Sequence, residues 1–454
     1  MAASKSPTEL GHKDIKKLLL DYSLPAIVAQ MASSVYNIVD SIFIGQGVGP
    51  MAIAGMALTL PLMNMAAAFG ALVGAGGSTL ISIKMGQKDD QGAAHVLGNI
   101  AMLNIILGVA VMIIGLVFMD QILVLFGASE TTMPYAKEFM RVILIGNVVT
   151  HLYFGLNSAM RSSGNPRKAM ICTLVTVICN IILAPIFIFG FGWGLGGAAA
   201  ATVLSQTISL AVIIKHFADR NQFLHFQRFA FRLKKNIVKG ILSIGISPFA
   251  INICSCMVVI LINNQLYTYG GDYAIGAYGN VNKILMLFAM VVLGINQGMQ
   301  PIAGYNYGAK QYDRVGEVLK FAILYAEVVM ITACVASELF PHQIMSMFTP
   351  DEKMIADSAY GLRITVATFP LVGFQMVATN FFQSIGKALW SAVLSTTRQL
   401  LFLLPLLLIL PNIFELLGVW ICLPIADTLA FVVTAILLWN QLKKFKTEQT
   451  QPNI

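Results

Sequence analysis

The sequence predicts an all-α polytopic membrane protein with 12 transmembrane helices in two six-helix bundles related by a parallel internal repeat. Three observations predict it: an apolar composition, a series of long hydrophobic runs, and a one-sided distribution of basic residues. Of 454 residues, 57% are hydrophobic and 11% are charged, with a mean hydropathy of +0.76, whereas soluble domains carry about 25% charged residues. A soluble protein of this composition would need one very large core and almost no polar surface.

The hydrophobic runs are long enough to cross a bilayer, since about 20 apolar residues span the hydrocarbon core. The run after Pro50 has no charged side chain before Lys84, and its many Gly and Ala residues would let other helices approach closely. The predicted spans are residues 18–45, 51–83, 94–118, 135–160, 168–189, 195–217, 237–269, 275–303, 315–340, 358–385, 389–411 and 416–442.

Basic residues lie mostly on one side of these spans. When the loops are assigned alternately to the two sides, 23 of the 29 Lys and Arg residues fall on one side and four on the other. Lys5, in the N-terminal tail, belongs to the larger group. Lys283 and Arg398 remain inside predicted helices. Because cytoplasmic loops carry the excess of positive charge, this pattern predicts an even number of spans and both termini in the cytoplasm. The net charge of +8 then reflects membrane topology, and no nucleic-acid partner is expected.

Short motifs in the first half of the chain recur in the second half at one constant offset. The matching pairs are Gly86/Gly308, Lys88/Lys310, Val96-Leu97/Val318-Leu319, Gly164/Gly386 and Leu195-Gly196/Leu417-Gly418, with Pro25/Pro248 one position further apart. Since each copy holds an even number of spans, both enter the membrane in the same direction, as in the parallel repeats of some transporters.

The repeat divides the chain into five parts. They are an N-terminal tail (1–17), an N-lobe (18–217), a basic linker (218–236), a C-lobe (237–442) and a C-terminal tail (443–454), with both tails and the linker in the cytoplasm. The linker mixes aromatic and basic residues, which favours a helix lying at the lipid surface over a partner-binding segment.

No catalytic pattern is present in the sequence. There is no Walker A loop and no HExxH motif, and the six cysteines lie in apolar runs without the spacing of a zinc site. We therefore expect a transporter rather than an enzyme, with no cofactor.

Charged residues inside predicted spans are functional candidates, because a charge at mid-bilayer costs at least about 2.5–3.5 kcal/mol. Asp40 is the strongest, since burial disfavours its charged form and would let it take and release a proton. Glu327, Asp427, Arg398 and Lys283 are secondary candidates, with an intramembrane ion pair as the alternative interpretation. Pro25 and Pro248 are candidate hinges, because proline removes a helical hydrogen bond.

Several motifs resemble the MATE (multidrug and toxic compound extrusion) family. They are NIVDSIFIGQGVG (37–49), MRSSGNPRKAM (160–170), CNIILAPIFIFGFGWGLGGAAAAT (179–202) and QPIAGYNYGAKQYDRV (300–315). The last of them, together with FFQSIGKALWSAVLSTTRQ (381–399), is similar to the bacterial MepA-type branch. The resemblance covers residues 15–440 and implies a two-lobed antiporter that exports organic cations against inflow of H⁺ or Na⁺.

The resemblance also implies site residues. Asp40 matches the acid of the N-lobe cation site, and Asn180 and Thr202 match its oxygen donors, so Na⁺ could be held by these three. Asn157 is a further candidate for cation coupling or substrate binding. Family members often carry a second acid at the position of Ala184, and some carry one in the seventh span, which here is uncharged. The coupling ion, H⁺ or Na⁺, is therefore left open.

The sequence thus predicts a secondary active multidrug efflux antiporter of the cell membrane, monomeric, with lipophilic and often cationic drugs as substrates. A flippase for lipid-linked saccharides is the alternative, although its anionic substrates would call for more basic residues than Lys283 and Arg398. A non-transporting scaffold or receptor is the third class, and the paired repeat argues against it.

Overall fold

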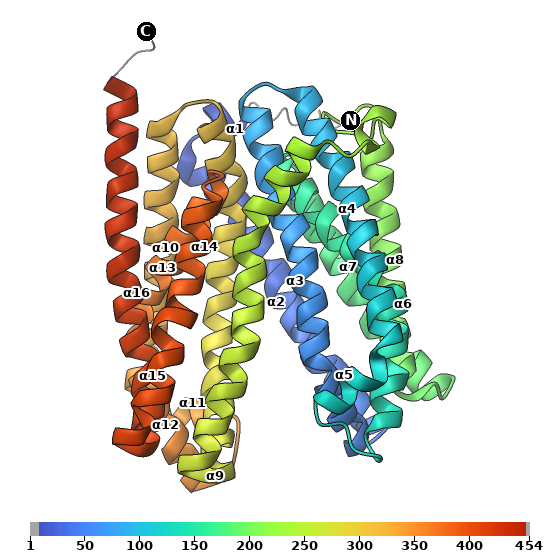
Figure 1. Cartoon of the computed structure of the whole chain (residues 1–454), viewed down its shortest axis with the longest axis vertical. Helices are drawn as coiled ribbons and strands as arrows, with labels where there is room; N and C mark the ends of the chain where they lie inside the picture. The colour runs from blue at the N-terminus through green and yellow to red at the C-terminus, as the bar shows by residue number, and fades with distance from the viewer. Residues whose placement is uncertain (1–8, 451–454) are drawn as a thin grey trace. The chain divides into compact units, whose positions relative to one another are not determined.

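The computed structural model describes residues 9–450, which form helices and contain no strand (Figure 1). Lys5 and the outer parts of both predicted tails, residues 1–8 and 451–454, lie outside the described residues. Within the described part, ten helices are long and apolar enough to cross a membrane, or eleven if one bent pair counts as a span. A polytopic, all-α membrane protein is therefore confirmed.

The first half of the chain contains long helices that follow the predicted ranges, together with a few short ones. The elements are α1 (Glu9–His12), α2 (Ile15–Gly47), α3 (Pro50–Gly86), α4 (Asp90–Val117), α5 (Met119–Leu125), α6 (Met133–Ser162), α7 (Pro166–Pro185), the π-helix η1 (Ile186–Gly190) and α8 (Gly194–Ala218). Pro166 lies in the first turn of α7, where a missing N–H costs no hydrogen bond.

The second half of the chain also contains long helices, but more of them are broken into shorter segments. Its elements are η2 (Arg228–Phe231), α9 (Lys235–Gly308), α10 (Tyr312–Leu339), α11 (Pro341–Ser346), α12 (Glu352–Val366), α13 (Phe369–Ser384), α14 (Ala388–Thr396), the π-helix η3 (Thr397–Leu403), α15 (Leu404–Ile409) and α16 (Pro411–Thr450).

Two interruptions of the helices explain why the number of elements differs from the number of predicted spans. A straight helix of 74 residues like α9 would measure about 110 Å, several times the bilayer core. Gly271, with φ 64°, divides it into two helices instead. Conversely, α12 and α13 together correspond to the predicted span 358–385 and are bent by 53°, because Pro370 in the first turn of α13 cannot continue the preceding helix. The described helices then match the predicted ranges, and the number of crossings stays a prediction.

The predicted interfacial helix at 218–236 was wrong. Only the single turn η2 is helical there, because the linker backbone is bound to Asn99 of α4. The Asn99 amide donates to the carbonyls of Ala230 and Arg232, 3.1 Å in each case, and its oxygen accepts from the N–H of Lys234 at 3.1 Å. These bonds hold the linker backbone in a non-helical path.

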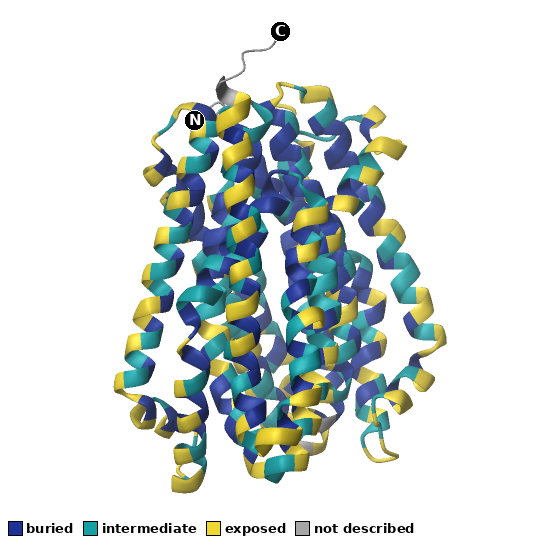
Figure 2. Ribbon diagram, turned by 60° about the vertical axis from the view of Figure 1, so that its left-hand side comes forward, coloured by how far each residue is buried: buried dark blue, intermediate teal, exposed yellow. Residues whose placement is uncertain are grey.

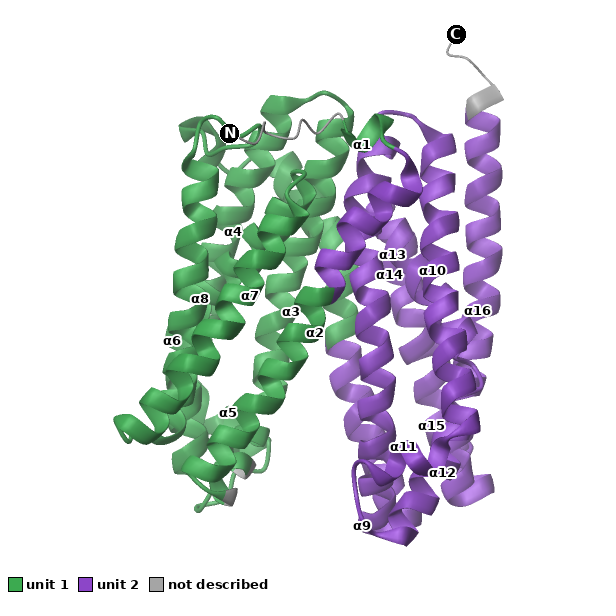
Figure 3. Ribbon diagram, turned by 180° about the vertical axis from the view of Figure 1, so that it is seen from behind, with its two compact units in different colours: residues 1–13, 28–252 green, residues 14–27, 253–454 purple. Residues whose placement is uncertain are grey.

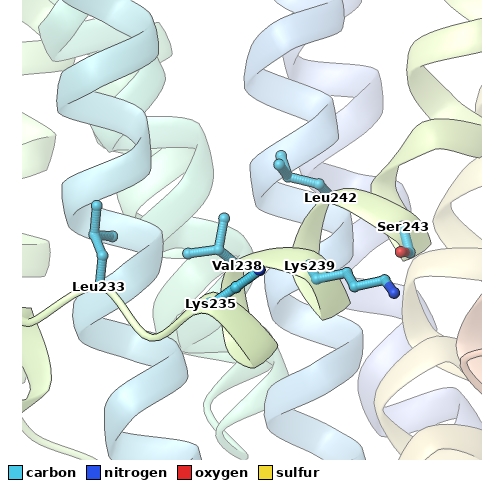
Figure 4. Close-up of a pocket in the computed structure, with 6 residues that line it drawn as sticks. All are labelled: Leu233, Lys235, Val238, Lys239, Leu242 and Ser243. Atoms are coloured by element: carbon cyan, nitrogen blue, oxygen red, sulfur yellow. The ribbon is translucent and has the colours of Figure 1, made fainter.

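Beside the end of the linker lies a shallow pocket of about 580 Å³. Figure 4 shows its lining residues, which are Leu233, Lys235, Val238, Lys239, Leu242 and Ser243. The two lysines are exposed on the first turns of α9. In the linker itself, Arg228, Arg232 and Lys234 are exposed as well, so it keeps its basic character at the surface although it is not a helix.

Two compact units make up the chain (Figure 3). Unit 1 holds residues 1–13 and 28–252, and unit 2 holds residues 14–27 and 253–454. The predicted lobes, 18–217 and 237–442, stay predictions, and the units differ from them in giving the start of α2 to unit 2 and the start of α9 to unit 1. Both helices change unit within about one turn after a proline, Pro25 in α2 and Pro248 in α9.

Exposed residues recur along the helices (Figure 2), and many of them are large hydrophobic side chains. Ile38, Ile182 and Ile436 have exposed fractions of 63%, 56% and 56%. Soluble monomers rarely expose apolar surface on this scale, so these side chains are placed for contact with lipid.

The backbone repeats where the sequence repeats. Three pairs of positions with positive φ recur at the offset of the sequence motifs: Gly49 and Gly271 (108° and 64°), Lys88 and Lys310 (58° and 59°), Gly164 and Gly386 (95° and 73°). A lysine rarely adopts this conformation, so its recurrence at equivalent turns supports a duplicated unit.

One such turn offers a stability test. Asp89 caps α4 by accepting the N–H of Gly92 at 2.8 Å, and its other oxygen accepts from Lys84 Nζ at 2.8 Å. The Lys84 hydrogen bond and the capping bond hold the pKa of the Asp89 carboxyl below its ordinary value. Asp89→Ala should therefore destabilise the protein by about 0.5–2 kcal/mol at pH 7, measured by thermal unfolding in detergent.

The pH dependence follows from the lowered pKa. Stability from the charged carboxylate is present above the unfolded pKa of about 4 and is lost as pH falls through the folded pKa, so wild type and Asp89→Ala should converge in acid. Asp89→Asn, which keeps a capping oxygen, is the matched control and should lose less. An Asp89→Ala penalty that stays constant down to pH 3 would contradict this account.

Candidate cation-coupling site

Asp40 lies on α2 in unit 1 and is buried, with 8% of its surface exposed. Its Oδ1 atom is buried and has no hydrogen-bond partner within residues 9–450. A buried polar atom without a partner is costly, and a buried charge without one is more so. The carboxyl group therefore has a free site that a proton or a small cation would satisfy.

Next to Asp40 on the same helix face lies Tyr36, one turn earlier. Its hydroxyl lies 3.0 Å from Thr202 Oγ1 of α8, and the Asn180 amide of α7 donates to the same oxygen at 3.1 Å. The Thr202 hydroxyl itself donates to the carbonyl of Ala198 at 3.2 Å, so Tyr36 is the donor in its bond. The structure thus brings Asn180 and Thr202 together with the helix that carries Asp40.

Tyr36 was missed in the sequence analysis. The signal that would have found it is its spacing of one helical turn from Asp40, which places both side chains on one helix face. That Asp40 shares a site with Asn180 of α7 and Thr202 of α8 was implied only by the family resemblance, which does not extend to Tyr36.

An apolar wall lies one turn beyond Asp40. Ile44 and Ala184 are fully buried there and pack in one cluster with Ile188 and Leu195. Ala184, where the family resemblance led us to look for a second acid, therefore contributes a buried methyl group. Over the described chain, no group of three His, Cys, Asp or Glu residues is placed to hold a metal ion.

Asn157 does not join this cluster. Its amide donates to the carbonyl of Ala169 at 3.0 Å, which ties α6 to the start of α7. Ala169 lies three helical turns before Asn180, about 16 Å along a helix axis. Asn157 thus fastens a helix hairpin at some distance from Asn180 and Thr202.

In unit 2 the expected intramembrane ion pair is present. Arg398 Nε donates to Asp427 Oδ1, and the Thr368 hydroxyl donates to Asp427 Oδ2 at 3.4 Å. The next residue, Gln399, donates to the hydroxyl of Ser255 at 2.9 Å. Asp427 is buried and has a partner for each oxygen, in contrast to Asp40.

The other two charged candidates stay outside this pair. Lys283 is exposed and places its ammonium 5.4 Å from the ring centre of Phe348. Glu327 lies beside Gly373 and Phe374, near the start of α13. The ion-pair interpretation therefore holds for Arg398 and Asp427 only.

Both candidate hinge prolines lie inside helices. Pro25 lies in α2 and Pro248 in the first arm of α9. The carbonyl of Pro248 accepts a hydrogen bond from the Asn252 side-chain amide at 2.8 Å, whereas the helical hydrogen bond lost through the proline is the one to the carbonyl of Ile244, four residues earlier.

The match to a known protein family agrees with the duplicated fold. The model of the MatE family matches residues 25–186 and 246–409. The chain belongs to the MatE family. The two matched segments fall one in each half of the repeat, as expected for a duplicated transporter.

Relatives in the MatE family match over nearly the whole chain. The multidrug export protein MepA of Staphylococcus haemolyticus is 28% identical over 426 residues, 94% of either chain, and that of Staphylococcus aureus strain N315 is 27% identical over 423 residues, 93% of either chain. A solved MATE in the bent conformation aligns with TM-score 0.93 and 26% identity, covering 99% of this chain and 100% of that one. A MOP superfamily transporter from Pyrococcus furiosus aligns with TM-score 0.92 and 26% identity, covering 98% and 100%.

The ion pair of unit 2 predicts a clear stability pattern. Arg398→Gln should destabilise the protein by several kcal/mol, about 3 or more, because it leaves the buried carboxylate of Asp427 unpaired. The double variant Arg398→Met with Asp427→Leu should recover most of the loss, since an apolar pair leaves no buried charge. Thermal unfolding in detergent measures both, and a double variant no more stable than Arg398→Gln would argue against the pair as the cause.

Proposed function

We propose that this protein is a secondary active multidrug exporter that exchanges lipophilic, often cationic compounds for H⁺ bound at Asp40. The observation that carries the proposal is a buried carboxylate with an unpartnered oxygen in a chain of the MatE family. Its relatives named multidrug export protein MepA support the substrate class. The geometry around Asp40 supports the ion.

The hydrogen bonds of Thr202 favour H⁺ over Na⁺. A hydroxyl oxygen has two lone pairs, and those of Thr202 accept from Tyr36 and Asn180 while its proton goes to Ala198. No lone pair is left for a sodium ion. With Ala184 in place of a second acid, Asp40 supplies a single negative charge, which one proton neutralises.

The same carboxylate suits a cationic substrate. A buried negative charge in apolar surroundings binds either a proton or an organic cation, and the two would compete for it. In the cycle that we propose, protonation of Asp40 from outside releases the drug, and loss of the proton to the cytoplasm restores the drug site.

A bend of α2 at Pro25 would couple protonation of Asp40 to release of the drug. Pro25 lies inside α2, where its missing N–H weakens the helix, and α2 changes unit at residue 28. Solved MATE structures described as bent and straight, with TM-scores of 0.93 and 0.92, support two conformations of this fold. We assign the same hinge role to Pro248 in the second half.

The placement of the termini follows from the distribution of basic residues. We propose a monomer in the cytoplasmic membrane with both termini in the cytoplasm, without a cofactor, enzymatic activity or a nucleic-acid partner. The flippase alternative is disfavoured, because Arg398 is paired with Asp427 and Lys283 lies over an aromatic ring. With Arg398 neutralised by Asp427, Lys283 is the one candidate cation of the two that keeps its charge, whereas an anionic lipid-linked substrate calls for several.

The proposal predicts a transport phenotype for Asp40→Asn. Proteoliposomes with wild-type protein should move ethidium under an imposed proton gradient and not under a sodium gradient, and Asp40→Asn should abolish the proton-driven flux. Tyr36→Phe should slow it several-fold, because one hydrogen bond worth about 1 kcal/mol is lost.

Asp120→Asn, in an exposed acid paired with Lys137, is the control and should transport normally. Flux driven equally well by sodium would reject the assignment of H⁺, and undiminished flux in Asp40→Asn would remove Asp40 from the mechanism.

A further inference from the structure

A second cavity lies entirely within unit 2, at the turn between the two arms of α9. It has a volume of about 260 Å³ and is lined by residues of α9, α12 and α16, namely Gly270, Tyr273, Ala274, Ala277, Lys353, Asp357, Tyr360, Leu416, Leu417 and Trp420. Drug-sized ligands occupy pockets of about 300–1,000 Å³, so this one suits a smaller molecule. None of the residues assigned above to transport takes part in it.

The walls combine aromatic rings with one carboxylate. Tyr273 and Tyr360 are exposed at the rim, whereas Trp420 is buried. The indole of Trp420 packs against α12 where Gly361 leaves room, since a methyl group at Gly361 would overlap the ring. Small residues of α9, Ala274 and Ala277, keep the space in front of the rings open.

Asp357 supplies the only acidic group among the lining residues, which also include the basic Lys353. Within residues 9–450, no lysine, arginine or histidine forms an ion pair with it. Asp351, the other acid nearby, is already engaged, because it caps α12 through the N–H of Met354 at 2.8 Å and accepts from the Tyr273 hydroxyl at 3.3 Å. Asp357 therefore leaves a negative charge available at the pocket.

The chain itself shows that one of these rings, that of Tyr273, accepts a cation. The ammonium of Lys353 lies 4.8 Å from the ring centre of Tyr273, within the range of a cation–π interaction. Lys353 thus occupies part of the cage in the way that a cationic ligand would. A carboxylate beside electron-rich rings is the arrangement that recognises organic cations.

We infer that this pocket binds a small aromatic organic cation, with Asp357 as the counter-ion and the rings of Tyr273, Tyr360 and Trp420 as the cage. Lys353 is its intramolecular competitor. The inference does not depend on Asp40 or on the coupling ion. It adds a binding site in the second half of the molecule to the transport site proposed in the first.

Trp420 provides a local probe of binding. In a variant that keeps Trp420 and replaces Trp193, Trp390 and Trp439 by Phe, N-methylpyridinium should quench the indole fluorescence in a saturable manner. The full-length protein in detergent serves for the titration.

Substitutions at the two charged groups should have opposite effects. Asp357→Asn should weaken binding by about two- to fivefold, the scale of one partly exposed ion pair. Lys353→Gln should strengthen it, because it removes both a competing and a repelling charge. A gain of affinity cannot arise from misfolding, so Lys353→Gln keeps the test decisive if Asp357→Asn is unstable.

Two results at the pocket itself would overturn the inference, and so would a third, at Asp40. One is unchanged binding in Asp357→Asn. The other is weaker binding in Lys353→Gln, which would point to an anionic or zwitterionic ligand. Asp40→Asn separates this site from the transport site, since it should leave the Trp420 titration unchanged even if the transport proposal fails. Loss of quenching in Asp40→Asn would assign the signal to the transport site and reject the second one.

Discussion

A carboxylate inside a membrane protein must find partners, because hydrocarbon offers none and an unpaired charge there is costly. The two halves of this chain meet that constraint in opposite ways. In unit 2, Asp427 has a partner for each oxygen, Arg398 and Thr368. In unit 1, Asp40 keeps one buried oxygen without a partner among the described residues. The first acid is a structural element and the second is available for chemistry, so the proposed exchange depends on this asymmetry.

The asymmetry is built on a symmetric scaffold. Left-handed turns recur at equivalent positions of the two copies, including one at Lys88 and Lys310 where a lysine is unfavourable, and the MatE family model matches once in each half. Each copy also begins with a helix that contains a proline and changes unit shortly after it. The backbone of the repeat has thus been retained while its polar residues have diverged.

Much of this architecture was predictable from the sequence, because composition, hydrophobic length and the recurrence of short motifs do not depend on tertiary contacts. The Asn180 and Thr202 pair was found from the family resemblance. Tyr36 was not, since its role requires knowing that α2 faces α7 and α8. The sequence also did not show which of the four other charged candidates form an ion pair. Arg398 finds its partner on a different helix, and Lys283, which forms no such pair among the described residues, is likewise a basic residue inside a predicted span.

The linker shows why a local pattern can mislead. Its basic and aromatic residues are typical of an interfacial helix, yet Asn99, far earlier in the chain on α4, binds its backbone in another form. Likewise, the bend between α12 and α13 follows from a proline that local hydropathy does not register. In both cases a tertiary or backbone constraint overrode the average properties of the segment.

The central claim is that a proton on Asp40 and a drug compete for one carboxylate. The most direct test is to measure proton release when a cationic drug is added to the purified protein in a weakly buffered solution. The account predicts that wild type releases up to one proton for each drug bound and that Asp40→Asn releases none. Equal proton release by Asp40→Asn would contradict it.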